Sequence, residues 1–276
     1  STYIFLNINN HKEIIMKIEY RHSASKTNTF LDSPAFWIIN ELFDFESEPN
    51  ARMVMGLAAE DAADHALSKQ IKDQDTITNY AKSQYIRHSK DEMDDLLPTE
   101  HTDAEYEWSA IIANKFVENL REFGDVVSFQ NELQIPGDKY GLKYDVIGKT
   151  DFEFKDVIVD TKATAYIRRL KAGHVDPKWY PKPADVRQQC LYRDLFGKET
   201  MLLYCSPKDQ YVVDMVERDE LQVLINAMKH IEYVLDICKT KEDVVRIFPL
   251  VCENFRWKGS PGSEEFAKDL WTKSLK

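Results

Sequence analysis

GKTDFEFKDVIVDTKAT, residues 148–164, is the most informative segment of this sequence. Its β-branched and aromatic runs predict two strands joined by a turn at the Lys-Asp pair 155–156. Asp160 and Lys162 lie two positions apart on the second predicted strand, so both side chains project from one face. The preceding Val-Ile-Val run indicates a strand that is buried on both faces, where an unpaired charge is costly. We therefore expect this carboxylate and this ammonium to share one pocket.

A second carboxylate belongs to the same pocket. Asp151 ends the first predicted strand, and the turn that follows can bring it beside Asp160. Two converging carboxylates suit a hard divalent cation such as Mg²⁺, which prefers oxygen ligands and keeps several waters. The spacing alone equally favours a structural ion pair between Asp160 and Lys162, with Asp151 in a turn. Asp145 is an alternative strand acid, because it is an even number of residues from Asp151.

The segments around this centre alternate between strand and helix patterns. Residues 126–167 predict a three-stranded antiparallel meander, and residues 200–216 predict a hairpin of two more strands. Helices are expected on both sides of them, with a weak N-terminal hairpin before residue 20. The sequence therefore predicts an α/β fold with a central mixed sheet covered by helices. The expected helices are a Pro-started pair from residue 25, residues 51–71, residues 108–123 closed by Gly124, a helix capped by Asp185 and ended at Gly197, and C-terminal segments that include residues 241–255.

Composition excludes several classes of protein. The chain has 276 residues, of which 43% are hydrophobic and 30% charged, as in ordinary globular proteins. It contains no run of 18 apolar residues and no basic flank before an apolar N-terminal stretch, so we expect a cytoplasmic protein without membrane contact. The four scattered cysteines predict reduced, mostly buried thiols. Phosphate-loop and dinucleotide-loop motifs are absent, which argues against nucleotide-driven motors, kinases and Rossmann oxidoreductases.

Five short motifs follow one another in a fixed order. They are SASKTNTFLDSP near the start, a Gly56-x-x-x-Glu60 pattern, GKTD ending at Asp151, DTK at Asp160–Lys162, and a Gln188-x-x-x-Tyr192 pattern. In this order the sequence resembles the PD-(D/E)XK nuclease superfamily, specifically the RecB-type branch that includes phage, mitochondrial and CRISPR-associated exonucleases. The resemblance implies a restriction-endonuclease-like mixed β-sheet core flanked by helices. It also implies a single nuclease domain over residues 1–276, in which residues 66–124 are a helical insertion or cap.

The resemblance assigns roles to these residues. Asp151, Asp160, Glu60 and the backbone carbonyl of Thr161 would ligate Mg²⁺, for which Mn²⁺ is the expected substitute. Lys162 would orient or activate the attacking water and stabilise the charge that develops on the phosphoryl oxygens. The remaining two assigned residues, one helical turn apart on a common face, would position the substrate or the lysine; they are Gln188 and Tyr192.

Each assignment has a rival. Glu60 belongs to an acidic cluster that could lie at the surface, and His65 is an alternative ligand. Gln189 replaces Gln188 if the helix is rotated, and Tyr192 could be a core residue. The sequence departs from the branch members that hold an iron–sulfur cluster, because Ser33 occupies the early cysteine position and the two late cysteines are 14 residues apart. We therefore expect no iron–sulfur cluster and a C-terminal part closed by ordinary packing.

A locally basic segment follows the DTK motif. Between Lys162 and Arg187 the chain has seven Lys or Arg residues and two acids, although its net charge is −11. Cations that neutralise phosphates and rings that stack on bases are what a single-strand channel needs. A solvated basic loop is the alternative. The expected DNA-binding residues are Arg168, Arg169, Lys171, Lys178, Trp179, Tyr180, Lys182 and Arg187.

These features predict a Mg²⁺-dependent DNA exonuclease that acts on single strands or DNA ends in recombination, repair or DNA processing. A recombination or single-strand-binding protein is a conceivable partner. An endonuclease of the same superfamily is one alternative. A non-catalytic DNA-binding or protein-interaction module on a nuclease-like fold is another.

Overall fold

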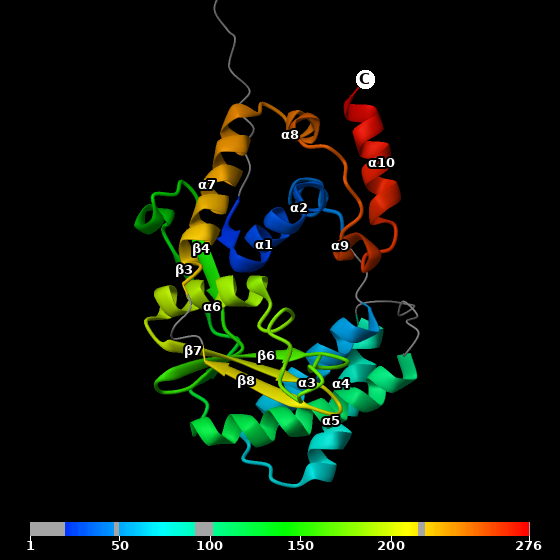
Figure 1. The fold of residues 1–276 in the computed structure, drawn as a ribbon, viewed down its shortest axis with the longest axis vertical. Helices are drawn as coiled ribbons and strands as arrows, with labels where there is room; N and C mark the ends of the chain where they lie inside the picture. The colour runs from blue at the N-terminus through cyan, green and yellow to red at the C-terminus, as the bar shows by residue number, and fades with distance from the viewer. Residues whose placement is uncertain (1–19, 47–49, 92–101, 215–218, 276) are drawn as a thin grey trace, which may run out of the picture.

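The computed structural model describes residues 20–46, 50–91, 102–214 and 219–275. The described residues form a mixed α/β fold with two sheets and surrounding helices (Figure 1), as the sequence predicts. The expected N-terminal hairpin lies outside these residues. Within them, no helix combines the length and apolar character that a membrane crossing requires. The four cysteines are free, and three of them are buried, which confirms the expected thiols.

The larger sheet holds the DTK strand near its middle. Its order is β2-β5-β6-β7-β8, and β6 and β7 run parallel whereas the other neighbours are antiparallel. The predicted hairpin at residues 200–216 is confirmed by β7 and β8 as far as residue 214, and residues 215–216 lie outside the described residues. The strands are β2 (Ser128–Phe129), β5 (Phe152–Glu153), β6 (Val157–Ala163), β7 (Glu199–Cys205) and β8 (Gln210–Asp214).

The predicted single meander is wrong, because its strands divide between two sheets. β3 (Glu132–Ile135) and β4 (Val146–Lys149) pair with β1 (His22–Ser23) in a separate sheet of order β1-β4-β3. Alternation of apolar residues marks a strand but does not choose its partner. β4 also packs closely against a helix at Gly148, where an added Cβ would come within 2.7 Å of Leu195 Cδ1. The chain leaves the small sheet after this close contact and enters the large sheet at β5.

Three helices cover one face of the large sheet. α3 (Ala51–Ser68), α4 (Gln74–Asp91) and α5 (Thr102–Leu120) pack on one another, and α3 and α5 also contact β6. Residues 66–124, expected as an insertion or cap, contribute α4 and α5 to this layer. Small side chains on α3 allow the close approach of its neighbours. The buried alanines of α3 are Ala51, Ala58, Ala59, Ala62, Ala63 and Ala66.

A second apolar cluster lies around Trp37 in the part of the molecule drawn above the large sheet (Figure 1). The predicted Pro-started helix pair is confirmed as α1 (Ala24–Asp32) and α2 (Pro34–Leu42), with Ser33 as the N-cap of the second helix. The expected helix over residues 241–255 is wrong in its middle, since Pro249 disfavours helical geometry at the residue before it. The C-terminal helices are α7 (Leu221–Ile237), α8 (Lys241–Ile247), α9 (Phe255–Lys258) and α10 (Ser263–Ser274).

α6 (Pro183–Phe196) connects the two parts, because it packs on β7 of the large sheet and on β4 of the small one. It ends at Gly197, whose φ of +64° is the left-handed conformation expected of a helix-ending glycine. The predicted cap at Asp185 is wrong: the helix begins at Pro183, which lacks an N–H and fits the first helical position. Asp185 therefore lies inside the first turn, where its carboxylate accepts the Tyr204 hydroxyl instead.

Candidate functional site

Asp151 reaches the DTK strand through a backbone contact. The β5–β6 pairing ends at Phe152 and Val159, and beyond it the Thr161 N–H donates to Asp151 Oδ2 at 2.8 Å. The Thr161 hydroxyl is 3.3 Å from the same oxygen. The Asp151 side chain thus continues the sheet where the neighbouring strand stops, which holds its carboxylate beside the residues of DTK.

Asp160 and Lys162 share one pocket, as their spacing predicts. The Lys162 ammonium contacts Asp160 Oδ2, and the Asp160 side chain is fully buried. Among the described residues, neither oxygen of Asp160 has a hydrogen-bond partner beyond this ion pair. Burial raises the pKa of Asp160 well above its usual range, and the Asp151 charge raises it further. Burial lowers the pKa of Lys162, but Asp160 and Asp151 outweigh it and raise that pKa.

Glu60 joins these acids from α3. Burial and then the Asp151 charge raise the pKa of Glu60 well above its usual range, and Asp160 adds to the effect. One turn earlier, an added Cβ at Gly56 would be 3.7 Å from the Ala163 side chain, which places this part of the helix against the end of β6. Three carboxylates from three segments therefore repel one another around one lysine.

The rival residues lie elsewhere. The His65 ring stacks on Tyr80 with 3.8 Å between ring centroids, on the side of α3 that faces α4. Asp61, next to Glu60, binds His88 Nε2 at 2.8 Å. Asp145 accepts a hydrogen bond from Gln134 Nε2 at 2.6 Å, on the small sheet. These contacts favour Glu60 and Asp151 over His65 and Asp145 as members of the cluster.

Gln188 and Tyr192 form a pair beside the cluster. Gln188 Nε2 donates to the Tyr192 hydroxyl at 2.8 Å. Burial raises the pKa of Tyr192, and the charges of Asp160 and Asp151 raise it further, so the phenol keeps its proton at neutral pH. The alternative residue Gln189 is fully buried, and its amide has no hydrogen-bond partner among the described residues. Of the two glutamines of α6 considered from the sequence, Gln188 is therefore the one that contacts Tyr192.

The cluster has the composition of a cation site. Within residues 20–46, 50–91, 102–214 and 219–275, no three His, Cys, Asp or Glu side chains already have the arrangement of metal ligands. The donor set nevertheless fits Mg²⁺: Glu60, Asp151 and Asp160 are hard oxygen ligands, and among the described residues Asp160 has no hydrogen-bond donor besides the Lys162 ammonium. Burial raises the pKa of Glu60 and Asp160, and repulsion between the carboxylates adds to the increase. A divalent cation would neutralise that repulsion.

The basic segment after DTK is only partly available for contact. The Arg168 guanidinium lies over the Trp179 ring at 5.1 Å, and this ring is 49% exposed. Arg169 is paired with Asp209, and its Nη2 is 2.8 Å from Asp209 Oδ1. The predicted base-stacking role of Tyr180 is wrong in this structure, because its ring is buried and packs edge-on against another tyrosine. The remaining expected lysines of this segment are exposed at the surface: Lys171, Lys178 and Lys182.

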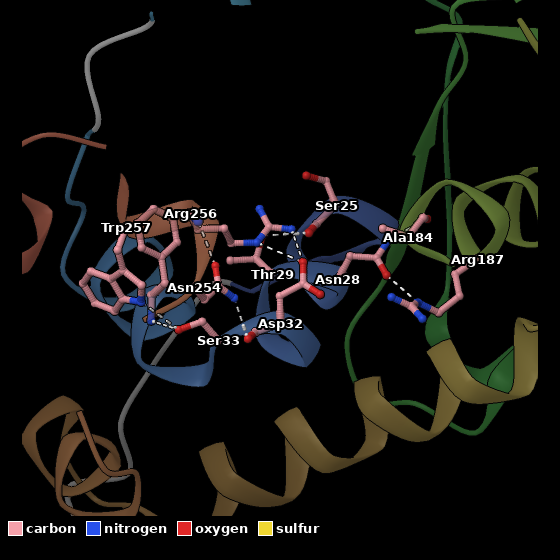
Figure 2. A network of polar contacts seen from close by, with 11 residues as sticks. Ser25, Asn28, Thr29, Asp32, Ser33, Ala184, Arg187, Asn254, Arg256 and Trp257 are labelled. Atoms are coloured by element: carbon pink, nitrogen blue, oxygen red, sulfur yellow. Dashed lines mark hydrogen bonds and ion pairs between the residues drawn. The ribbon is translucent and has the colours of Figure 1, made fainter. Parts of the chain in front are cut away.

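Arg187 belongs to a group of hydrogen bonds that connects α1 and α6 (Figure 2). Its Nε donates to Asn28 Oδ1 at 2.6 Å, while Asn28 Nδ2 donates to the Ala184 carbonyl at 2.9 Å. Glu220 lies 3.7 Å from its guanidinium. The expected DNA contact of Arg187 is therefore replaced by a structural one that fixes the first turn of α6.

The same view shows how the C-terminal part closes on α1. Arg256 binds the Asp32 carboxylate at 2.7 Å, and Asn254 Nδ2 donates to the Asp32 carbonyl at 2.7 Å. Trp257 Nε1 donates to Ser33 Oγ at 3.2 Å, so this serine caps α2 and binds the C-terminal segment as well.

Two residues near the cluster were not assigned to it from the sequence. Asp185 is expected only as a helix cap and Tyr204 only as a strand residue. The register between β6 and β7 sets Tyr204 beside Lys162, and Tyr204 binds Asp185. No local sequence pattern specifies that register, because the two strands are joined by a long crossover.

Comparisons with known proteins place this chain in no established family. No family model matches it, and no curated protein matches it. Among solved structures, the crystal structure of SSO0001 aligns at 12% identity over 75% of this chain and 85% of that chain, with a TM-score of 0.32. A similarity at this TM-score carries no argument about fold or function.

Proposed function

We propose that this chain is a metal-dependent nuclease that hydrolyses DNA phosphodiester bonds, on the restriction-endonuclease-like fold that its motifs imply. The observation that carries the proposal is the convergence of Glu60, Asp151, Asp160 and Lys162, which come from α3, the β4–β5 turn and β6. A buried carboxylate whose single partner is one ammonium is incompletely hydrogen-bonded, which costs stability, and strongly perturbed groups of this kind gather at functional sites.

Glu60, Asp151 and Asp160 would hold the cation, together with the Thr161 carbonyl that the resemblance implies. A bound Mg²⁺ polarises phosphoryl oxygens and lowers the pKa of its water. Lys162 keeps its proton, because the neighbouring carboxylates raise its pKa, and its charge stabilises negative charge on the phosphoryl group. Lys162 thus adds a positive charge for the phosphoryl group, which the carboxylates alone would repel.

The Gln188–Tyr192 pair supplies a directed hydrogen-bond donor. The Tyr192 hydroxyl accepts the Gln188 N–H, so its own proton is available for another acceptor. A phosphate oxygen held at the cluster is an acceptor of the right kind, and the raised pKa of Tyr192 keeps the donor protonated.

Single-stranded DNA or a DNA end is the proposed substrate. Trp179 is partly exposed and carries Arg168 on its face, and Tyr166 is 67% exposed in the same segment. Aromatic faces beside cations favour strands whose bases are unstacked. This segment begins directly after β6, so a strand bound there leads to the carboxylates.

The test is cleavage of end-labelled linear and covalently closed circular DNA, single-stranded and double-stranded, with Mg²⁺ and with chelator. We expect Mg²⁺-dependent shortening of linear strands by the wild type and none by Asp160→Asn or Lys162→Met. Asp145→Asn is the matched control, because Asp145 is the rival acid on the small sheet, and it should cleave like the wild type.

Each other outcome selects a different conclusion. Cutting of closed circles favours an endonuclease. Equal cleavage by the wild type and Asp160→Asn would mean that the activity comes from another site. If the protein neither cleaves DNA nor binds Mg²⁺ or Mn²⁺ in calorimetry, the alternative of a non-catalytic module is favoured.

A further inference from the structure

Tyr204 is placed beside Lys162 by the sheet itself. β6 and β7 are parallel, and their register pairs Lys162 with Tyr204. Paired residues on neighbouring strands project from the same face, so the side chains of Tyr204 and Lys162 leave the sheet next to each other. Tyr204 is only 1% exposed, which means that neighbouring groups determine where its hydroxyl points.

The Tyr204 hydroxyl has a defined direction. It accepts the Lys182 N–H at 3.3 Å and donates to Asp185 Oδ2 at 2.6 Å. A phenol has a single proton, so the two bonds together fix Asp185 as the acceptor. Burial raises the pKa of Tyr204, and Asp185 raises it further, so this proton stays in place across the neutral range.

Asp185 itself faces the cluster from the first turn of α6. Its negative charge contributes to the raised pKa of Asp160 and of Lys162. The same turn is fixed to α1 by the Asn28–Ala184 and Asn28–Arg187 hydrogen bonds (Figure 2). Asp185 is thus a carboxylate held by Tyr204, and its charge acts on a lysine whose present partner is Asp160.

The two roles of Asp160 conflict. In this structure Asp160 Oδ2 is engaged by the Lys162 ammonium. The same carboxylate is the most deeply buried oxygen ligand of the proposed cation site. A cation at this carboxylate would compete with the ammonium, whose side chain is 27% exposed. The displaced ammonium would favour another anionic partner, because a partly buried charge is costly to leave unpaired.

We propose that Asp185, oriented by Tyr204, is a positioning residue that receives the Lys162 ammonium when a divalent cation occupies the Asp160 carboxylate. The inference rests on the proposed function and adds a residue to it. The lysine keeps its proton and exchanges one ion-pair partner for another, so the step involves no covalent change. Asp185 thereby favours cation binding and keeps the ammonium next to the cluster.

The experiment measures Mg²⁺ affinity by calorimetry in a double-mutant cycle of Asp185→Asn and Lys162→Met. In the wild-type background Asp185→Asn should weaken Mg²⁺ binding by about tenfold, because the ammonium then stays with Asp160. In the Lys162→Met background the same substitution should have no effect. Tyr204→Phe, which removes the hydroxyl that orients Asp185, should shift the affinity in the same direction by a smaller factor.

Asp194→Asn is the matched control. Asp194 also lies on α6 and also accepts a tyrosine hydroxyl, from Tyr140 at 2.5 Å, but this pair is at the other end of the helix. The Mg²⁺ affinity of the Asp194→Asn variant should equal that of the wild type. Thermal unfolding of every variant without metal separates loss of fold from loss of the ion-pair exchange.

The outcomes distinguish this inference from the function on which it rests. An equal loss of affinity from Asp185→Asn with and without Lys162 would overturn it, since Asp185 would then act on the cation directly or through the fold. No loss in either background would overturn it as well. A wild-type protein that neither binds Mg²⁺ nor cleaves DNA would overturn the proposed function, and the inference with it.

Discussion

Two buried carboxylates on the large sheet have opposite surroundings. Glu153 on β5 accepts hydrogen bonds from Ser128 Oγ and Asn131 Nδ2, each at 2.7 Å, and pairs with Lys198 at 2.7 Å. Burial acts to raise the pKa of Glu153, but these three partners outweigh it and lower the pKa. Asp160 on β6 has only Lys162, and its pKa is raised.

The difference is the one expected between a structural acid and an acid that binds a ligand. A buried carboxylate that is fully hydrogen-bonded contributes to stability, whereas one with unsatisfied oxygens reduces stability unless a ligand completes it. Glu153 fits the first description and Asp160 the second. Substitutions at the two positions should therefore affect stability, metal binding and activity in opposite ways.

The largest expected effect is on cleavage. Asp160→Asn should lower the Mg²⁺-dependent rate on end-labelled single-stranded DNA by about 10³-fold or more, because it removes a cation ligand. Glu153→Gln should stay within about threefold of the wild type when assayed well below its melting temperature, as expected for a residue outside the site. A comparable loss in both variants would show that the two acids do not differ in function.

The next effect is stabilisation by the cation. Mg²⁺ at about 100 times its dissociation constant should stabilise the wild type by about 2.7 kcal/mol, since the ion binds the folded state alone. The shift should persist in Glu153→Gln and disappear in Asp160→Asn. Urea unfolding with and without Mg²⁺ measures it, and NaCl at the same ionic strength tests for a nonspecific salt effect.

Without metal, the two substitutions should differ in stability. Glu153→Gln should destabilise the protein by about 2 kcal/mol, because it weakens the Lys198 ion pair and opposes the amide donor of Asn131. Asp160→Asn should stay within about 1 kcal/mol of the wild type, because it removes a charge that repels Glu60 and Asp151. A large loss in Asp160→Asn under chelator would mean that its ion pair with Lys162 is structural.

The smallest effect is a difference in the sign of the pH dependence. The lowered pKa of Glu153 contributes stability that is present above its ordinary value of 4.5 and is lost as the pH falls through the folded pKa. The raised pKa of Asp160 contributes stability below its ordinary value of 3.8 that is lost as the pH rises through the folded pKa.

With chelator present, acidification should therefore shrink the deficit of Glu153→Gln relative to the wild type. The same acidification should improve the wild type relative to Asp160→Asn. The expected changes are about 1.4 kcal/mol per pH unit at most for one group, and urea midpoints between pH 3 and pH 8 measure them. Parallel trends in the two variants would contradict the assignment of opposite pKa shifts.

The sequence predicts the local part of the candidate site well. The two-residue spacing of Asp160 and Lys162 is enough to place both on one face of a strand. The helix pair around Ser33 follows from Pro34 and its capping serine. Both features depend on neighbours within a few residues, which a linear pattern contains.

The nonlocal part could not be predicted from the residues alone. Glu60 is one of several acids on α3, and only the motif order favoured it over its neighbours. Tyr180 looks like a stacking residue in a basic segment, but tertiary packing buries it against Tyr204. The role of Asp185 depends on the register of β6 and β7, which is set by packing across a long crossover.

The Trp257–Ser33 hydrogen bond has a consequence for synthesis on the ribosome. It joins residues 224 positions apart, so 224 further residues must be synthesised after Ser33 before Trp257 is available to it. Until then Trp37 and its neighbours lack the cover of α10, while α3 to α5 and the large sheet already have all their residues. The nascent protein can thus assemble its acidic cluster before the helix pair that supports α6 is closed.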